Sequence, residues 1–250
     1  MAPATAKTEA EFTYALQIEQ AERYGRLLHE YDEAAHLAAG FLAEATDTPL
    51  STIHDGLAVE QDGKQFRAVY APDGVATYEV MVRRGRVRRD TFKDGQSVRA
   101  LTDVQQGMLK ARAAAKEMDF AKCEGDYHYL PIPIHQEADD LTYRVYVLLQ
   151  APSETQAPIG GHFRADISGD DFSVLGFEAY ANSCLILAGP ETKPKEAEVV
   201  GAFTTTSLFP HPRDIHVYLG LKFEMPYFLG TAENRVVWKI EYGLISVVQE

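Results

Sequence analysis

The sequence has few cysteines and no long apolar run. Cys123 and Cys184 are the only cysteines among its 250 residues, too few for a disulfide scaffold, and they lack the CxxC spacing of a zinc knuckle or a redox pair. We expect two buried free thiols, with a disulfide across two strands as the alternative. No apolar stretch approaches the roughly 18–20 residues that a membrane-spanning helix needs, so we do not expect a membrane protein.

The N-terminal stretch MAPATAKTEAEF also lacks the basic and apolar regions of a signal peptide. We therefore predict a soluble, cytoplasmic protein, or a periplasmic one if a leader has been removed. The hydrophobic content of 46% allows a substantial core, in one large domain or two small ones.

Basic residues are scarce relative to acidic ones. Lys and Arg total 24 against 37 for Asp and Glu, a net charge of −13. That surplus repels phosphate backbones at long range, so we expect no nucleic acid partner and favour a basic protein partner. Residues 1–50 hold 3 basic and 9 acidic side chains, and we predict that acidic residues of an N-terminal helix contact the partner. They are Glu19, Glu22, Glu30, Asp32 and Glu33.

The first half of the chain predicts a helix, a small sheet and a second helix. Apolar residues recur at helical spacing over residues 9–45, after a capping box at Thr8 and Glu11, and the length allows a break near Gly25. A period-two pattern over residues 57–92, interrupted by Gly-containing turns, predicts an antiparallel meander of about four strands. Thr102 and Gln105 form another capping box, at the start of a helix predicted over residues 102–118.

From Tyr127 onward the chain is mostly strand-like. Short runs of β-branched and aromatic residues alternate with Gly, Pro and Asp, which predicts an antiparallel sandwich or a strongly curved sheet. The predicted fold class is therefore α+β, with a helix, meander and helix region at residues 1–120 and an antiparallel β domain at residues 121–250. Residues 189–198 form the most linker-like loop.

The stretch FPHPRDIHVYLGL at residues 209–221 contains two histidines. His211 precedes a proline, which favours a turn, whereas His216 lies in an alternating apolar pattern that predicts a central strand. The two histidines are then not expected to act together, and as a zinc motif this spacing is weak. His216 needs a partner from another strand. His162 is the best candidate, and Asp214 is a further catalytic candidate.

Two other segments carry cationic side chains. In PIGGHFRAD, residues 158–166, Arg164 follows His162 by two residues on the same strand face, a pair suited to an anionic ligand. The segment RRGRVRR, residues 83–89, flanks a predicted hairpin turn and suits phosphate or an acidic partner. Strand alternation sends its arginines to both faces, so a hairpin edge protected by charge is the favoured interpretation.

Part of the sequence resembles a known group of proteins. The segments FAKCEGDYHYLPIP, TYRVYVLLQAP, PIGGHFRADIS, ANSCLIL and DIHVYLGLKFEMPYFLGT, within residues 118–245, resemble uncharacterised proteobacterial β-rich proteins, several of which carry an export leader. The resemblance implies that Cys123 and Cys184 are a structural pair and that the GGHFR and IHV segments belong to the framework. It implies no activity.

Three functions are compatible with these features. The first is a non-enzymatic protein-binding module, such as an immunity protein that neutralises a bacterial toxin, alone or as a homodimer. The second is a small metal-assisted hydrolase that uses His162 and His216. The third is a sensor that binds an anion through Arg164 and His162. No GxSxG, P-loop, GxGxxG or HExxH motif is present, so we rank binding above catalysis and expect no metal and no cofactor.

Overall fold

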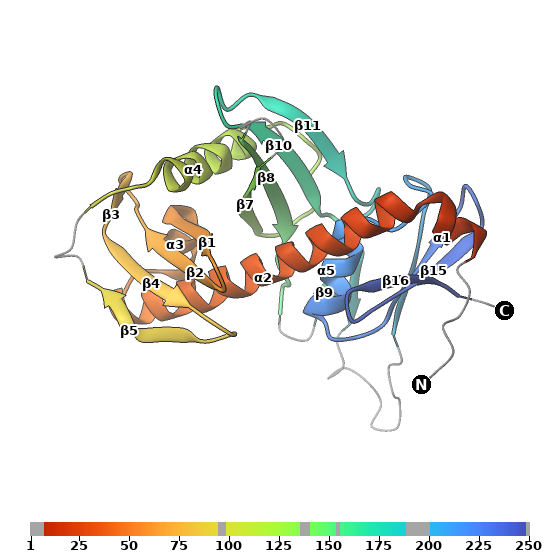
Figure 1. Cartoon of the computed structure of the whole chain (residues 1–250), viewed down its shortest axis with the longest axis horizontal. Helices are drawn as coiled ribbons and strands as arrows, with labels where there is room; N and C mark the ends of the chain where they lie inside the picture. Colours follow the sequence, from red (N-terminus) through yellow and green to blue (C-terminus); the bar gives the residue numbers. More distant parts are fainter. Residues whose placement is uncertain (1–7, 95–98, 136–140, 154–155, 189–200, 249–250) are drawn as a thin grey trace. The chain divides into compact units, whose positions relative to one another are not determined.

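The computed structural model describes residues 8–94, 99–135, 141–153, 156–188 and 201–248 (Figure 1). The chain divides into two compact units. The first unit comprises Met1–His29, Ala151–Gly161 and Tyr180–Glu250, and the second comprises Glu30–Gln150 and His162–Ala179. The division at residue 120 stays a prediction, and the linker predicted at residues 189–198 lies outside the described residues.

The second unit contains two antiparallel four-stranded sheets, ordered β1-β2-β4-β5 and β11-β10-β8-β7, and a short β3-β6 ladder. Its strands are β1 (Leu57–Asp62), β2 (Gln65–Tyr70), β3 (Val75–Ala76), β4 (Tyr78–Val82), β5 (Val87–Lys93), β6 (Arg99–Ala100), β7 (Tyr127–His135), β8 (Leu141–Leu149), β10 (Phe163–Ser168) and β11 (Val174–Ala179). Its helices are α3 (Leu50–Gly56), α4 (Asp103–Lys116) and residues 30–46 of α2 (Ala15–Thr46).

The predicted meander is confirmed by the strand order β1-β2-β4-β5. The turns between these strands contain the residues that such turns require. Gly63 and Gly74 have positive φ angles of 63° and 75°. At the turn between β4 and β5, Arg84 and Gly85 both have positive φ angles, 52° and 65°, and Arg83 and Arg86 exchange backbone hydrogen bonds across it. Two successive residues with positive φ give the turn that matches the twist of a hairpin.

The two predicted capping boxes are also present. The Thr8 side chain accepts a hydrogen bond from the Glu11 amide at the start of α1 (Glu9–Thr13), and Glu11 bonds back to the Thr8 amide. Thr102 and Gln105 make the same exchange at the start of α4. Each box satisfies two backbone N–H groups that a helix start leaves without partners.

The first unit combines a mixed sheet, a strand pair and two helical segments. Its sheet has the order β13-β14-β15-β16, where β13 (Ala202–Thr206) runs parallel to β14 (Tyr227–Thr231), and β15 (Val236–Glu241) and β16 (Leu244–Val247) continue antiparallel. Helix α5 (Asp214–Lys222) connects the two parallel strands. The strand pair consists of β9 (Gln156–Pro158) and β12 (Ile186–Ala188). The helical segments at the N-terminus are α1 and residues 15–29 of α2.

The strand predicted at DIHVYLGLKF is wrong, because these residues form helix α5. Ile215, Val217, Tyr218 and Leu219 are all buried, so the helix is apolar on every side and shows no helical stripe. A short apolar run of this kind does not distinguish a strand from a buried helix. The expectation of antiparallel strands is also wrong for β13 and β14, which run parallel. Helix α5 is the crossover that two parallel strands need.

The expectation of two buried free thiols is wrong as well. Cys123 and Cys184 are both disulfide-bonded, and Cys184 is exposed while Cys123 is half-buried. The fold class itself is confirmed as α+β with mainly antiparallel sheets. None of the described helices is long and apolar enough to cross a membrane.

Candidate functional site

The start of α5 positions two predicted catalytic residues, His216 and Asp214. His216 is buried, and its Nδ1 atom accepts a hydrogen bond from the Arg213 backbone N–H at 3.0 Å. Asp214 is also buried and accepts a hydrogen bond from the Tyr180 hydroxyl at 2.7 Å. Because Nδ1 of His216 is an acceptor here, the ring carries its proton on Nε2. Both side chains thereby hold the first turn of the helix.

The second histidine of that stretch, His211, lies before α5, as predicted. Its Nδ1 atom is 3.0 Å from the carbonyl oxygen of Pro212, and its ring packs against Tyr14 with the centroids 5.1 Å apart. A ring nitrogen that bonds a carbonyl oxygen must donate, so Nδ1 of His211 carries a proton. The two histidines therefore have different tautomers and different partners.

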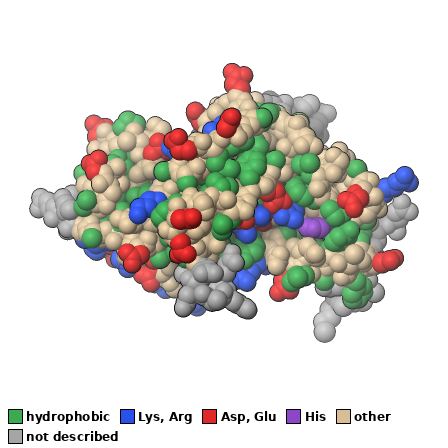
Figure 2. Space-filling model, turned by 90° about the horizontal axis from the view of Figure 1, so that it is seen from above, with side chains coloured by type: hydrophobic (Ala, Val, Ile, Leu, Met, Phe, Trp, Pro, Cys, Tyr) green, Lys and Arg blue, Asp and Glu red, His purple; other side chains and the backbone are tan. Residues whose placement is uncertain are grey.

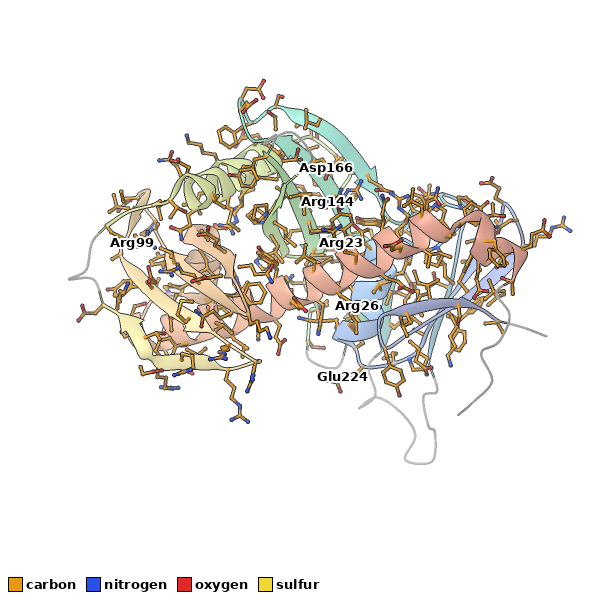
Figure 3. The ribbon with its side chains drawn as sticks, in the orientation of Figure 1. Arg23, Arg26, Arg99, Arg144, Asp166 and Glu224 are labelled. Atoms are coloured by element: carbon orange, nitrogen blue, oxygen red, sulfur yellow. The ribbon has the colours of Figure 1, made fainter. Side chains whose placement is uncertain are left out.

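His162 and Arg164 lie in the second unit, at and near the start of β10. His162 is buried, and its Nδ1 atom accepts a hydrogen bond from the Leu149 backbone N–H at 3.2 Å. Arg164 forms ion pairs with Glu178 at 3.0 Å and with Asp166 at 3.4 Å. Asp166 is also bound by Arg144 at 2.9 Å, and this pair is drawn in Figure 3. Of the pair predicted to bind an anion, Arg164 is therefore engaged with carboxylates and His162 with a backbone amide.

His162 and His216 do not lie on neighbouring strands of one sheet. His162 belongs to the second unit and His216 to the first. Within the part of the chain that the structure describes, no group of three or more His, Cys, Asp or Glu residues is arranged to hold a metal ion. The sequence suggested that the two histidines lie on neighbouring strands. His216 lies in the helix at residues 214–222 instead, so one of those two strands does not exist.

The acidic residues of α2 do not form one exposed face. Glu22 accepts a hydrogen bond from the Ile245 backbone N–H at 2.7 Å, and Asp32 is buried, 3.6 Å from Nδ1 of His128. Asp32 is therefore not exposed in the free protein, and the prediction that the acidic residues contact a partner stays a prediction. Glu19, Glu30 and Glu33 are exposed. On the face drawn in Figure 2, acidic and basic side chains are interspersed.

Glu30 and Glu33 line a hollow of about 360 Å³ in the second unit. They are three residues apart on α2 and so share one face of the helix. Two hairpin turns contribute Lys64 and Arg84, and Phe66 and Val82 supply apolar surface. Gly85 has a φ angle of 65°, which favours glycine, and it lies close to the hollow, because a Cβ atom on it would be 2.9 Å from the Glu33 carboxylate. We call this the α2 hollow.

A second hollow, of about 410 Å³, is lined by Arg83, Arg84, Arg86 and Arg88. Strand alternation predicted that the five arginines of residues 83–89 would be divided between two faces. Four of them surround this space, whereas Arg89 lies over the ring of Phe41. Arg88 is held by Asp90 at 2.9 Å. Arg84 lines both hollows.

Six charged side chains line these hollows without an ion pair to any other residue that the structure describes. We call them the charged surface: Glu30, Glu33, Lys64, Arg83, Arg84 and Arg86. Sequence reasoning identified the two glutamates and the arginines separately. It missed Lys64 and the closeness of the two groups, because both depend on how α2 packs on the hairpins.

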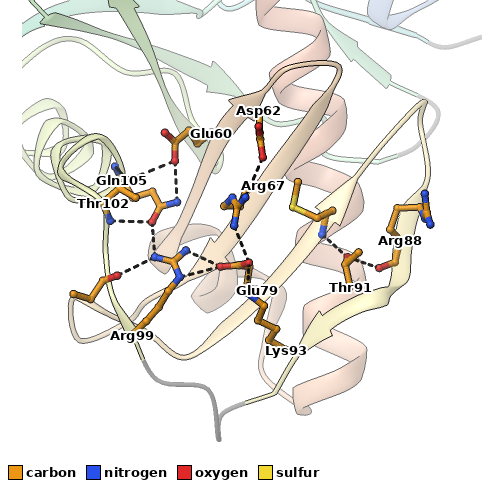
Figure 4. A network of polar contacts seen from close by, with 12 residues as sticks. Glu60, Asp62, Arg67, Glu79, Arg88, Thr91, Lys93, Arg99, Thr102 and Gln105 are labelled. Carbon is orange, nitrogen blue, oxygen red and sulfur yellow. Dashed lines mark hydrogen bonds and ion pairs between the residues drawn. The ribbon is translucent and has the colours of Figure 1, made fainter.

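The polar network around Glu79 shows the opposite arrangement within the same sheet (Figure 4). Glu79 is buried and accepts hydrogen bonds from Arg67 at 3.1 Å, Lys93 at 2.9 Å and Arg99 at 2.6 Å. Arg99 also bonds Gln105, the capping residue of α4. This network joins β2, β4, β5 and β6 to the start of α4, and its charges are neutralised within the chain. The charged surface differs from this network, because its six charged side chains have no ion-pair partner among the described residues.

No protein-family model matches the chain, and no curated protein or solved structure matches it.

Proposed function

We propose that this protein is a non-enzymatic, acidic protein-binding module, and that its partner contacts the charged surface of the second unit. The single observation that supports this proposal is the convergence of six charged side chains, none paired with a residue of the described chain, on two hollows that share Arg84 in their lining. Charges left without partners in the free protein are available to pair across an interface, where complementary charge sets orientation and speeds association.

The chemistry of the surface defines the partner. The net charge of −13 attracts a basic protein at long range. At contact, Glu30 and Glu33 suit a lysine or arginine whose apolar stem lies along Phe66 and Val82, while its charged end meets the carboxylates. The arginine hollow adds a requirement for at least one acidic group on the same partner.

A finer form of the proposal is that the partner is a bacterial toxin that this protein neutralises. An immunity protein has to cover its target tightly and needs no catalytic group of its own, and a surface of mixed charge suits a toxin domain that presents both basic and acidic groups. Co-expression with the captured partner tests this form, because the protein then restores growth that the partner alone prevents.

The experiment is affinity capture with the full-length protein from an extract of the source cells at low ionic strength. Wild type is compared with Glu30→Lys/Glu33→Lys and with Arg83→Glu/Arg86→Glu. Glu19→Lys is the matched control, because Glu19 is equally exposed on α2 but does not line the hollow. We expect one protein to be recovered by wild type and the control, to be lost with both double variants, and to be released as salt rises.

Two results contradict the proposal. One is the absence of any recovered protein, and the other is equal recovery by wild type and both double variants. Light scattering of the purified protein identifies the case in which the partner is a second copy, since the oligomer then falls to a monomer in the double variants.

For the compartment, we propose an oxidising one such as the periplasm. Both cysteines are disulfide-bonded, and stable disulfides are rare in reducing cytosol. This proposal replaces the cytoplasmic expectation, and fractionation of the source cells tests it.

A further inference from the structure

A separate hollow of about 500 Å³ lies in the first unit, along strand β13. Its volume is within the range of small-molecule sites in proteins. We call it the β13 hollow, and the residues used below are Leu185, Phe203, Thr205, Leu208, His216 and Tyr227. Every lining residue belongs to the first unit.

The position of β13 explains why the hollow is open. Within the described chain, β13 is an edge strand that pairs only with β14. Side chains from both of its faces line the hollow, Thr204 and Thr206 from the buried face and Phe203 and Thr205 from the other. The strand edge itself therefore borders the space, and an edge presents backbone N–H and C=O groups.

The opposite side of the hollow is held by close backbone packing. A Cβ atom on Gly160 would lie 2.8 Å from the Leu185 backbone nitrogen, and also against the Ser183 carbonyl oxygen. The backbone N–H groups of Ile159 and Gly160 both donate to the carbonyl oxygen of Leu185, at 2.9 and 3.0 Å. This wall is preformed.

The lining of the hollow carries no formal charge. None of its described side chains is Asp, Glu, Lys or Arg, although such residues make up 24% of the sequence. His216 accepts a hydrogen bond at Nδ1 and is held as the neutral ring. A charged ligand would lose its hydration here without an opposite charge to replace it, which is unfavourable.

Hydroxyl and amide groups surround the hollow. Asn182, Ser183, Thr205 and Ser207 are exposed, and their side chains make no hydrogen bond to other described residues. Each of these groups both donates and accepts hydrogen bonds. They suit a ligand whose own groups do the same.

Apolar surface is concentrated at the same place. Phe203 is 58% exposed, Leu185 42% and Leu208 37%, and all three line the hollow. The ring of Phe203 lies over Gly230, where a Cβ atom would be 3.4 Å from Cζ. Exposed apolar side chains that gather within a polar rim are typical of binding grooves.

We propose that the β13 hollow binds a neutral saccharide. A sugar without carboxylate or amine groups has many hydroxyls that donate and accept, which match the hydroxyl, amide and strand-edge groups. It also has an apolar C–H face, which matches the exposed ring of Phe203. This site lies outside the charged surface and does not depend on the protein-binding proposal.

The experiment is titration of the full-length protein with neutral disaccharides (maltose, cellobiose and N,N′-diacetylchitobiose), followed by calorimetry and thermal unfolding. Glucuronate and glucosamine are the charged counterparts. We expect at least one neutral disaccharide to raise the melting temperature in a concentration-dependent way, with little effect of the charged sugars.

Phe203→Ala is expected to weaken binding about tenfold or more, about 1.4 kcal/mol. Val237→Ala is the matched control, because Val237 is exposed on the same sheet outside the hollow.

Three results overturn the proposal: no neutral disaccharide binds, the charged sugars bind equally well, or Phe203→Ala binds like wild type. Binding of an uncharged extended peptide in place of sugars overturns it too. Glu30→Lys/Glu33→Lys is expected to leave saccharide binding unchanged, so failure of this site and failure of the charged surface are distinguishable.

Discussion

Arg99 donates two hydrogen bonds to one carboxylate oxygen of Glu79, from Nη2 at 2.6 Å and from Nε at 3.0 Å. The Glu79 side chain is only 7% exposed, and Arg67 and Lys93 bond its other oxygen. A buried carboxylate is stable only when it is paired in this way. Substituting Glu79 therefore measures how much this charge pairing contributes to the stability of the second unit.

Replacing Glu79 with glutamine is expected to lower the free energy of unfolding by about 2 kcal/mol, because three cations lose their shared partner. Urea unfolding measures the change. Asp90→Asn is the control in the same sheet, since the Arg88–Asp90 pair is exposed and screened by solvent, and its loss is expected to change stability far less. Equal effects of the two variants would show that burial of Glu79 is unimportant.

Stability is expected to fall in acid because of His54. Burial, reinforced by His128, His36 and Arg112, lowers the pKa of His54 from 6.5 to about 3, although Asp32 acts in the opposite direction. Its Nδ1 atom is buried without a hydrogen-bond partner among the described residues. The His54 side chain therefore binds a proton below pH 6.5 in the unfolded chain, but only below about pH 3 in the folded protein.

The sign follows from that difference in bound protons: stability is full above pH 6.5 and decreases as the pH falls towards 3. The expected slope is about 1.4 kcal/mol per pH unit. Glu79 acts in a lower range, because hydrogen bonds from Lys93 and Arg99 outweigh the effect of burial and bring its pKa below the usual 4.5. Unfolding is therefore measured between pH 6.5 and 4.5, above the range of Glu79, and the difference in slope between wild type and His54→Leu gives the contribution of His54. His54→Leu should flatten the slope, and a slope that persists would refute the assignment.

A buried arginine is expected to be essential for the second unit. The Arg112 guanidinium donates to the backbone carbonyls of Tyr129, Asp55 and Leu57, at 2.9, 2.9 and 2.6 Å. Burial lowers its pKa to about 10, so it stays charged at neutral pH. Arg112→Met removes all three bonds and should destabilise by about 3–5 kcal/mol, and Arg112→Lys should restore only part because lysine lacks the planar fork. Lys116→Met, at a half-exposed position on the same helix, is the control. Chemical unfolding that gave equal losses for both methionine variants would contradict this role.

The oxidation state of the cysteines is directly measurable. Because Cys123 and Cys184 are disulfide-bonded, we expect an alkylating reagent to label neither residue in protein purified without reductant, and to label both after reduction and unfolding. Labelling of either residue before reduction would contradict the structure and remove the support for an oxidising compartment.

Local signals in the sequence predicted local structure correctly. The capping boxes at Thr8 and Thr102 and the glycines of the meander act within a few residues, so their outcome does not depend on the rest of the chain. Features that depend on packing were not predictable. Asp32 resembles its exposed neighbours in sequence, yet it is buried and lies beside His128. The helix at residues 214–222 was hidden because burial on all sides removes its periodicity.

Gly25 is the clearest case in which packing overrides a local preference. The sequence allowed a break there, yet α2 continues through it from Ala15 to Thr46. A Cβ atom on Gly25 would lie 2.5 Å from Cβ of Val217 and 2.6 Å from the Asp214 carbonyl oxygen. Neither atom moves when a side chain rotates, so α5 can pack at this distance only against a glycine.

Gly25→Ala is therefore expected to destabilise the protein by about 1–3 kcal/mol, although alanine is favoured within a helix by about 1 kcal/mol. Gly40→Ala is the matched control in the same helix, because a Cβ atom there has no neighbour within 4 Å. It should stabilise by up to about 1 kcal/mol. Thermal and urea unfolding of the two variants should thus shift in opposite directions. If both variants were stabilised, the close approach of α2 and α5 would be wrong.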